Sequence, residues 1–174
     1  VEERLQNGER FGVIAHVETS FTAIERRRGL LDAIENADRR MAGFAYCDGS
    51  MELARQQAID MLEQNPDITC MVGLNESSAL GICFALEELG LAGKIKLITC
   101  DSSEAMIKYM ENGTIQAFVI QNPFNIGYLS LQAAVQVLEG KRGEPLINTG
   151  SVPVPKEDMY RPENQKLLFP FTDG

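Results

Sequence analysis

The pattern that decides the fold lies in residues 67–101, DITCMVGLNESSALGICFALEELGLAGKIKLITCD. A short apolar run at 68–72 is followed by a longer helical run and by a second strand-like run at 94–100. This order is typical of a strand–helix–strand unit. Asn75 follows the first strand and Asp101 follows the second. Because neighbouring parallel strands end at the same edge of a sheet, we expect both polar side chains to face one crevice.

The helix of this unit can be predicted from its ends. Ser77 or Ser78 can cap its first turn, and Gly90 can adopt the left-handed conformation that ends it. Between these residues only Glu87 and Glu88 interrupt an otherwise apolar stretch. We therefore expect this helix to be covered on more than one side.

The same alternation extends through the first 121 residues. Strands are predicted at 11–16, 41–47, 68–73, 94–99 and 114–120, and further helices at 22–37, 51–64 and from Ser103 to Gly113. Right-handed crossovers place helices on both faces of such a sheet. The sequence therefore predicts an α/β fold, a doubly wound parallel sheet in a three-layer α/β/α arrangement. In the first helix we expect Ile24, Leu30, Leu31 and Ile34 to face inward.

After Gln121 the organisation changes. Asn122-Pro123 marks a turn, and residues 125–139 form an apolar helix that Gly140 ends. Five of the seven prolines follow, with one strand-like run at 149–154. This pattern indicates a segment that wraps around the fold rather than a second domain.

Composition limits the function classes. The chain is 44% hydrophobic and 24% charged, with a net charge of −9, which argues against nucleic-acid binding because such surfaces need clustered Lys and Arg. The basic run Arg26-Arg27-Arg28 is too short to change this. No apolar run is long enough for a membrane span, and no signal peptide opens the chain. Since Val1 begins in what looks like a helix end, we expect a mature product or a fragment.

The sequence offers no sign of catalysis. The four cysteines, Cys47, Cys70, Cys83 and Cys100, lack the spacing of a zinc site and read as buried small hydrophobes, although a bridge between Cys70 and Cys100 on adjacent strands stays open. No nucleotide-binding or hydrolase motif is found. The single histidine, His16, reads as a polar residue at a strand end. We therefore expect no enzyme, no cofactor and no metal.

Polar side chains recur where each predicted strand ends. These are Arg26, Asp48, Asn75, Glu76, Asp101 and Gln121. A carboxylate can accept from two vicinal hydroxyls, an Arg fork can donate to two, and an amide can do one of each. The set therefore suits a neutral polyhydroxylated ligand. The alternative is that Asp101 and Asn75 only cap helices.

Three stretches carry a resemblance to a known family: ERRRGLLDAI, NESSALGICFALEELG and residues 97–141, which contain CDSS and QNPFNIG. Together they resemble the second half of type I periplasmic solute-binding proteins, the ribose- and galactose-binding family of ABC sugar importers. The resemblance covers most of residues 8–155. It implies that Arg26, Asn75, Asp101 and Gln121 contact sugar hydroxyls, with Asp48 and Glu76 as additional candidates.

The resemblance also implies partners and a location. Residues 1–121 would form the second lobe of a two-lobe fold, and residues 122–174 a helix and tail that return to a first lobe missing before Val1. The partners would be a sugar and an ABC permease, and the location periplasmic or extracellular, with a membrane-attached lipoprotein included. The effector-binding core of a LacI-type repressor, which would be cytoplasmic, is the alternative. The stretch 121–127 favours the importer, whereas four cysteines favour the repressor.

Two departures from the family pattern affect these expectations. The family often has an aromatic ring after the second strand, where this chain has Cys47-Asp48-Gly49-Ser50, and Cys100 stands where many relatives have Phe.

Without a first lobe, the apolar helix 125–139 would lie exposed. We therefore expect this chain to self-associate as a homodimer.

Overall fold

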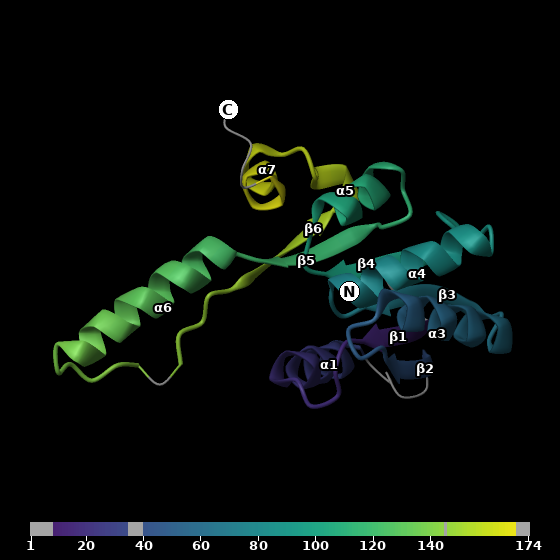
Figure 1. Cartoon of the computed structure of the whole chain (residues 1–174). Helices are drawn as coiled ribbons and strands as arrows, with labels where there is room; N and C mark the ends of the chain where they lie inside the picture. Colours follow the sequence, from purple (N-terminus) through teal and green to yellow (C-terminus); the bar gives the residue numbers. More distant parts are fainter. Residues whose placement is uncertain (1–8, 35–39, 145, 170–174) are drawn as a thin grey trace.

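The computed structural model describes residues 9–34, 40–144 and 146–169. Its centre is one six-stranded sheet in the order β2-β1-β3-β4-β5-β6 (Figure 1). The strands are β1 Arg10–Ala15, β2 Met41–Tyr46, β3 Ile68–Gly73, β4 Lys96–Cys100, β5 Ala117–Gln121 and β6 Ser151–Pro155. The first five are parallel, and β6 runs antiparallel to β5 at the edge. The predicted doubly wound α/β sheet is confirmed, with one antiparallel edge strand added.

Helices cover the two faces unequally. They are α1 Phe21–Ala33, α3 Met51–Gln64, α4 Glu76–Glu88, α5 Glu104–Glu111, α6 Pro123–Leu138 and α7 Pro162–Leu168, with a 3-10 turn η2 at Lys156–Asp158. Met71 and Phe118 pack with α3, α4 and α5 on one face, whereas Val72 and Ile98 pack with α1 on the other. This alternation along the strands produces the three layers.

The central helix α4 begins two or three residues earlier than predicted, at Glu76. Asn75, not Ser77 or Ser78, is its N-cap: the Asn75 side-chain oxygen accepts from the Ser78 amide at 3.0 Å, and the Asn75 amide donates to Ser78 Oγ at 3.0 Å. This reciprocal pair is a capping box. The hydroxyl of Ser78 therefore acts at the third position of the helix. Gly90, with φ at 63°, follows the helix in the left-handed conformation that was predicted.

A glycine lets α4 pack directly on α3. A Cβ placed on Gly81 would lie 2.5 Å from the carbonyl oxygen of Met51 and 2.8 Å from the amide of Arg55, and would collide with Cβ of Ala54. The two backbones can approach this closely only because Gly81 has no side chain. Together with the sheet below it, this contact explains why α4 is apolar on several sides, as expected.

The first helix differs from its prediction in one buried position. Ala23, Leu30 and Ile34 define the line that faces the sheet, and Leu31 is half-buried. This line turns Ile24 toward solvent, where it is 47% exposed, so the prediction that Ile24 faces inward was wrong. The helix ends at Ala33. Part of its predicted extension to residue 37 lies outside the described residues.

The tail after α6 returns to the sheet. β6 pairs with β5 from Gln121 opposite Ser151 to Ala117 opposite Pro155. Farther along, Met159 and Leu168 are buried in the same core as α5. Residues 151–169 therefore lie against β5 and α5, whereas the sequence analysis assigned the whole of residues 122–174 to a segment that returns to a first lobe. The strand-like run predicted at 149–154 corresponds to β6 at Ser151–Pro155, and its two prolines are tolerated because β6 is an edge strand.

All four cysteines are free. The register aligns Cys70 with Lys96, so Cys70 and Cys100 lie four positions apart along neighbouring strands, about 13 Å. A disulfide needs a much shorter separation. The bridge that the sequence left open is therefore absent. No helix within the described ranges is long and apolar enough to cross a membrane.

Candidate functional site

The guanidinium of Arg26 connects the carboxyl ends of three neighbouring strands. It extends from α1 and donates to the carbonyl of Leu74 after β3 at 2.6 Å. It donates to both carboxylate oxygens of Asp101 after β4, at 2.7 and 3.1 Å, and to the side-chain oxygen of Gln121 at the end of β5, at 3.2 Å. Three of the four main candidate residues are thus brought into direct contact.

The guanidinium of Arg26 keeps its positive charge. Burial opposes the charge on Arg26, but the hydrogen bonds and the negative charge of Asp101 outweigh it and raise the pKa of the guanidinium. The side chains of Arg26 and Asp101 are 19% and 34% exposed, so the pair is partly shielded from water yet open on one side. A bidentate pair of this kind fixes both side chains in one geometry.

The backbone of Asp101 is left-handed, with φ at 70°. For a residue with a Cβ this conformation is uncommon and costs on the order of 1 kcal/mol, although Asp tolerates it better than most. Asp101 does not cap the helix that follows, because Ser103 Oγ accepts from the Met106 amide in that role. The alternative that Asp101 only caps a helix is therefore wrong. Its strained backbone instead holds the carboxylate against Arg26.

Asn75 has the capping role that the alternative described. Its oxygen binds the Ser78 amide, and its Nδ2 donates to Ser77 Oγ at 2.7 Å. Nevertheless, it directly follows Leu74, whose carbonyl Arg26 binds, so it lies beside the cluster. The additional candidates Asp48 and Glu76 are exposed, and neither is among the described partners of Arg26.

We expect Asn75→Ala to lower the free energy of unfolding by about 1 kcal/mol, because the cap of α4 is lost. Asn75→Asp is the matched control: it keeps the capping oxygen and replaces the Nδ2 donor by a carboxylate oxygen, whose negative charge is favourable at a helix amino terminus, so capping should be retained. Urea unfolding followed by circular dichroism measures both. Equal midpoints for Asn75→Ala and the unaltered chain would show that the cap contributes nothing.

His16, at the end of β1, is the residue whose role the sequence did not indicate. Its Nε2 lies 3.1 Å from Ser20 Oγ and 3.0 Å from Thr22 Oγ1, and these two hydroxyls are 2.9 Å apart. Burial lowers the pKa of His16, the positive charge of Arg26 lowers it further, and Asp101 partly opposes this. The neutral ring thus ties the loop after β1 to the first turn of α1, the helix that positions Arg26. A lone histidine at a strand end was the only signal.

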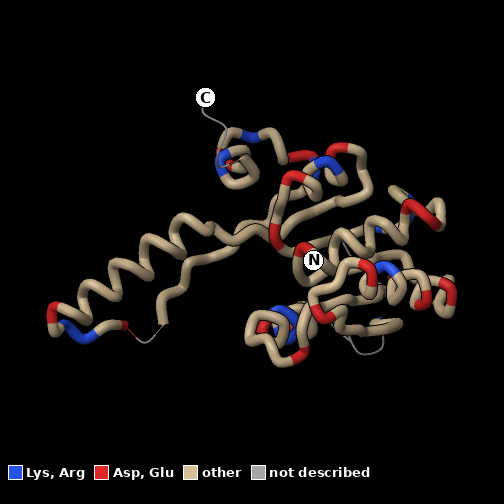
Figure 2. Tube along the Cα trace, in the orientation of Figure 1, with Lys and Arg blue, Asp and Glu red and all other residues tan. Residues whose placement is uncertain are grey.

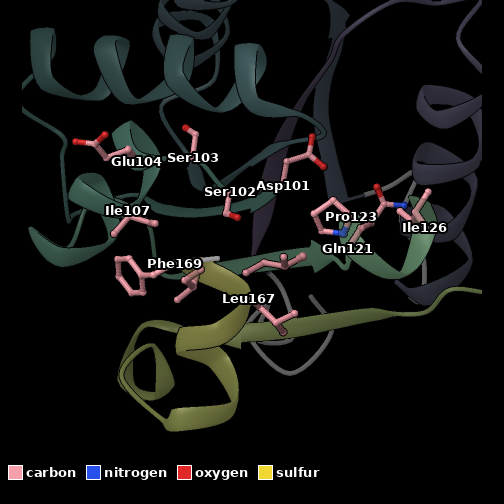
Figure 3. Close-up of a pocket in the computed structure, with 12 residues that line it drawn as sticks. Asp101, Ser102, Ser103, Glu104, Ile107, Gln121, Pro123, Ile126, Leu167 and Phe169 are labelled. Carbon is pink, nitrogen blue, oxygen red and sulfur yellow. The ribbon is translucent and has the colours of Figure 1, made fainter. Parts of the chain in front are cut away.

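A pocket of about 580 Å³ opens beside this cluster (Figure 3). Asp101 and Gln121 line it together with apolar side chains: Ile126 lies beside Gln121, and Ile107 and Phe169 lie at the other end. Helix α7 contributes to one wall through Leu167. The edge therefore places charged and amide groups next to an apolar surface.

The hydrogen bonds decide which groups remain available to a ligand. Four hydrogen bonds engage the two terminal nitrogens of Arg26. Each Asp101 oxygen accepts one of them and retains a further lone pair, and the amide nitrogen of Gln121 is not used in its bond to Arg26. Acceptors on Asp101 and donors on Gln121 match hydroxyl groups, which both donate and accept.

Comparisons with known proteins give a consistent result. A family model described as a periplasmic binding protein domain matches residues 1–142. The D-ribose/D-allose-binding protein of Pseudomonas aeruginosa is 28% identical over 142 residues, which are 82% of this chain and 44% of that protein. The ribose import binding protein of Bacillus subtilis is 32% identical over 90 residues, 51% of this chain and 28% of that protein. The chain thus spans less than half the length of these relatives.

Solved structures show the same architecture. A sugar transporter from Clostridium phytofermentans is 32% identical with a TM-score of 0.78, over 88% of this chain and 55% of that one. A carbohydrate transporter solute binding protein from Agrobacterium radiobacter, in complex with D-arabinose, is 27% identical with a TM-score of 0.83, over 92% of this chain and 55% of that one.

Proposed function

Because the chain belongs to the periplasmic binding protein domain family, we propose that it binds a neutral sugar or polyol for an ABC-type importer. One observation carries the proposal: Arg26 is bound to Asp101 and Gln121 at the carboxyl edge of the sheet, with unused acceptors and donors beside it. A carboxylate held in this way can accept hydrogen bonds from two adjacent hydroxyls.

The comparisons favour a binding protein of the importer class. The matched family consists of substrate-binding proteins rather than enzymes. One relative is named for ribose and allose, and one solved structure contains D-arabinose. Nothing in the comparisons supports the repressor alternative. For this chain we propose a pentose or hexose as ligand, an ABC permease as partner and the periplasm as location.

The proposed contacts differ in kind. Asp101 accepts from two hydroxyls, Gln121 donates through its amide, and Arg26 keeps both in place. Asn75 would add the second hydrogen of its Nδ2. The loop after β2, Cys47–Ser50, supplies no aromatic ring, so stacking on the sugar would come from elsewhere.

The proposed domain arrangement follows from where the described tail lies. Residues up to 121, together with the returning segment 151–169, form the second lobe. Residues 122–150, which contain α6, would reach toward a first lobe. The homodimer expected from the sequence is a separate proposal that concerns α6 rather than the sugar site.

The chain alone should bind sugar weakly. If two lobes contribute equally to a complex of about 1 μM, one lobe retains half of about 8.2 kcal/mol, which corresponds to a dissociation constant of about 1 mM. Ligand-observed saturation-transfer NMR in EDTA, with D-ribose, D-allose and D-arabinose against amino acids and nucleotides, tests the ligand class. We expect signals from one or more sugars. Signals only from amino acids or nucleotides, or binding only when metal is restored, would contradict the proposal.

A further inference from the structure

His16 connects the end of β1 to the start of the helix that carries Arg26. It directly follows β1, and its Nε2 atom lies 3.1 Å from Ser20 Oγ and 3.0 Å from Thr22 Oγ1, in the first turn of α1. Thr22 comes four residues before Arg26, so these two side chains lie on the same side of the helix, one turn apart. A change at His16 can therefore reach Arg26 through a single turn of α1.

Few features of α1 itself fix its first turn. Its N-cap residue, Ser20, makes no side-chain capping bond, and no acidic side chain lies in the first turn. Of its 13 residues, Ala23 and Leu30 are the buried ones. The first amides of a helix without a cap lack partners, and such an end is prone to fraying. The ring of His16 therefore supplies hydrogen bonds that hold the amino end of α1 against the sheet.

The surroundings of this ring favour its neutral form. Nδ1 of His16 is buried and has no hydrogen-bond partner among the residues that the structure describes. The neutral tautomer with its hydrogen on Nε2 donates to the hydroxyl oxygens of Ser20 and Thr22 and leaves Nδ1 without a hydrogen. Protonation would add a positive charge and an N–H at Nδ1, a buried donor with no acceptor in the described part of the chain. Proton uptake therefore works against the packing of the ring.

Two charged groups of the candidate site act on the ring. Burial opposes a positive charge on His16 most, the guanidinium of Arg26 opposes it next, and the carboxylate of Asp101 favours it, so the pKa of the ring is lowered. In Figure 2 the basic run 26–28 is coloured blue on α1, the helix to which the ring is bonded. The ring and the Arg26–Asp101 pair therefore sense each other's charge.

The other charged side chains on the adjoining segments contribute less. Glu18, in the loop after β1, and Asp48, after β2, are exposed to water, which screens their charges. Glu25, on α1, is paired with Arg28 at 2.8 Å. The proton on the ring therefore responds mainly to burial and to the ion pair of the candidate site.

We propose that His16 is a positioning residue for Arg26, and that the candidate site binds its sugar more tightly while this ring is neutral, so that affinity falls in mild acid. The inference rests on the proposed sugar binding. A protonated ring repels the guanidinium and attracts the carboxylate of Asp101, which disturbs the bidentate pair. Bound sugar, in turn, removes water from this pair and makes a further positive charge less favourable. Each unit by which the sugar lowers the pKa of His16 corresponds to a tenfold loss of affinity in acid.

The coupling between the ring and the ion pair can be measured without any sugar. His16 is the only histidine, so the change of its imaizole proton signals with pH gives its pKa directly by NMR. We expect Arg26→Gln to raise this pKa and Asp101→Ala to lower it, because the first change removes an opposing charge and the second a favourable one. Asp67→Ala, which breaks the ion pair with Arg10, is the matched control and should leave the pKa unchanged. A pKa near 6.5 in the unaltered chain, or one that neither site substitution moves, would overturn the coupling.

NMR titrations with D-ribose, D-allose and D-arabinose at two pH values test the consequence for binding. We expect the dissociation constant of the unaltered chain to rise by about 3–10-fold between about pH 7.5 and about pH 5.5, a range in which ordinary carboxylates stay ionised. His16→Ala should bind more weakly at both pH values. His16→Gln keeps an amide donor near the position of Nε2 but takes up no proton, so it should bind more tightly than His16→Ala and equally at both pH values. A pH dependence that survives in His16→Gln, or a His16→Ala chain that binds like the unaltered one, would overturn the proposal.

The outcomes separate this inference from the proposed function. Sugar binding that is equally tight at both pH values would overturn the inference and leave the proposed function standing. No binding of any of the three sugars at either pH would contradict the proposed function and the effect of His16 on affinity together. The pKa shifts of the ring would still decide whether it is coupled to the ion pair.

Discussion

Asp101→Ala should weaken sugar binding by about 100-fold or more, because each hydrogen bond from a hydroxyl to this carboxylate contributes about 1.5–3 kcal/mol. Two such bonds are proposed. The substitution also frees Arg26 from its bidentate partner, so the guanidinium keeps only Leu74 and Gln121. A site with a loosened cation and no acceptor would bind hydroxyls poorly. Titration by NMR would show the dissociation constant moving from about 1 mM to beyond about 100 mM.

The effect of Asp101→Ala on folding should be much smaller. The Arg26–Asp101 pair is partly exposed, and pairs of that kind contribute up to about 1 kcal/mol. Asp67→Ala is the matched control: it breaks the exposed ion pair with Arg10, in which Asp67 precedes β3 at the opposite edge of the sheet. Sugar binding should survive that change. Equal loss of binding in both variants would mean that the carboxylate of Asp101 has no special role.

Gly81→Leu should cost about 3 kcal/mol or more of the free energy of unfolding, a large part of the total for a domain of this size. The new side chain would meet the backbone of α3 at Met51 and Arg55. Backbone atoms inside a helix cannot move aside as a flexible side chain can, so the two helices would have to separate. The measurement is the midpoint of urea unfolding.

Gly29→Ala provides the contrast. Gly29 lies inside α1, and a Cβ there would meet nothing within 4 Å. Removing a helical glycine should raise the free energy of unfolding by about 0.5–1 kcal/mol. If Gly81→Leu were as stable as Gly29→Ala, the close contact between α3 and α4 could not exist in solution.

The fold was largely predictable because strong local signals agreed with the global arrangement. β3 occupies residues 68–73 and α3 occupies residues 51–64, as predicted. The apolar run at 68–72 marks β3, and Pro66 limits how far α3 can extend. The strand β6 was harder to predict because Pro153 and Pro155 argue against a strand, and only its position at the sheet edge makes it acceptable. Helical periodicity alone could not show which side of α1 faces the sheet, because this depends on how the helix packs on it.

The candidate site was also predictable only in part. Strand order alone brings the ends of β3, β4 and β5 together, which is why Asp101 and Gln121 could be predicted to share an edge. The sequence could not show that one guanidinium binds both, nor that Asp101 has a left-handed backbone. It also could not show that Asn75 caps a helix, α4, whereas Asp101 caps none. These features depend on side-chain geometry between segments distant in the chain.

The most direct test of the sugar-binding account is a residue-resolved NMR titration of the 174-residue chain with D-ribose, D-allose and D-arabinose. The account predicts that the backbone amide signals of Leu74, Asp101 and Gln121 shift together with at least one of these sugars, that the shifts saturate with a dissociation constant of about 1 mM, and that they vanish in Asp101→Ala. Shifts confined to other parts of the chain, or unchanged signals with every sugar up to about 100 mM, would contradict it.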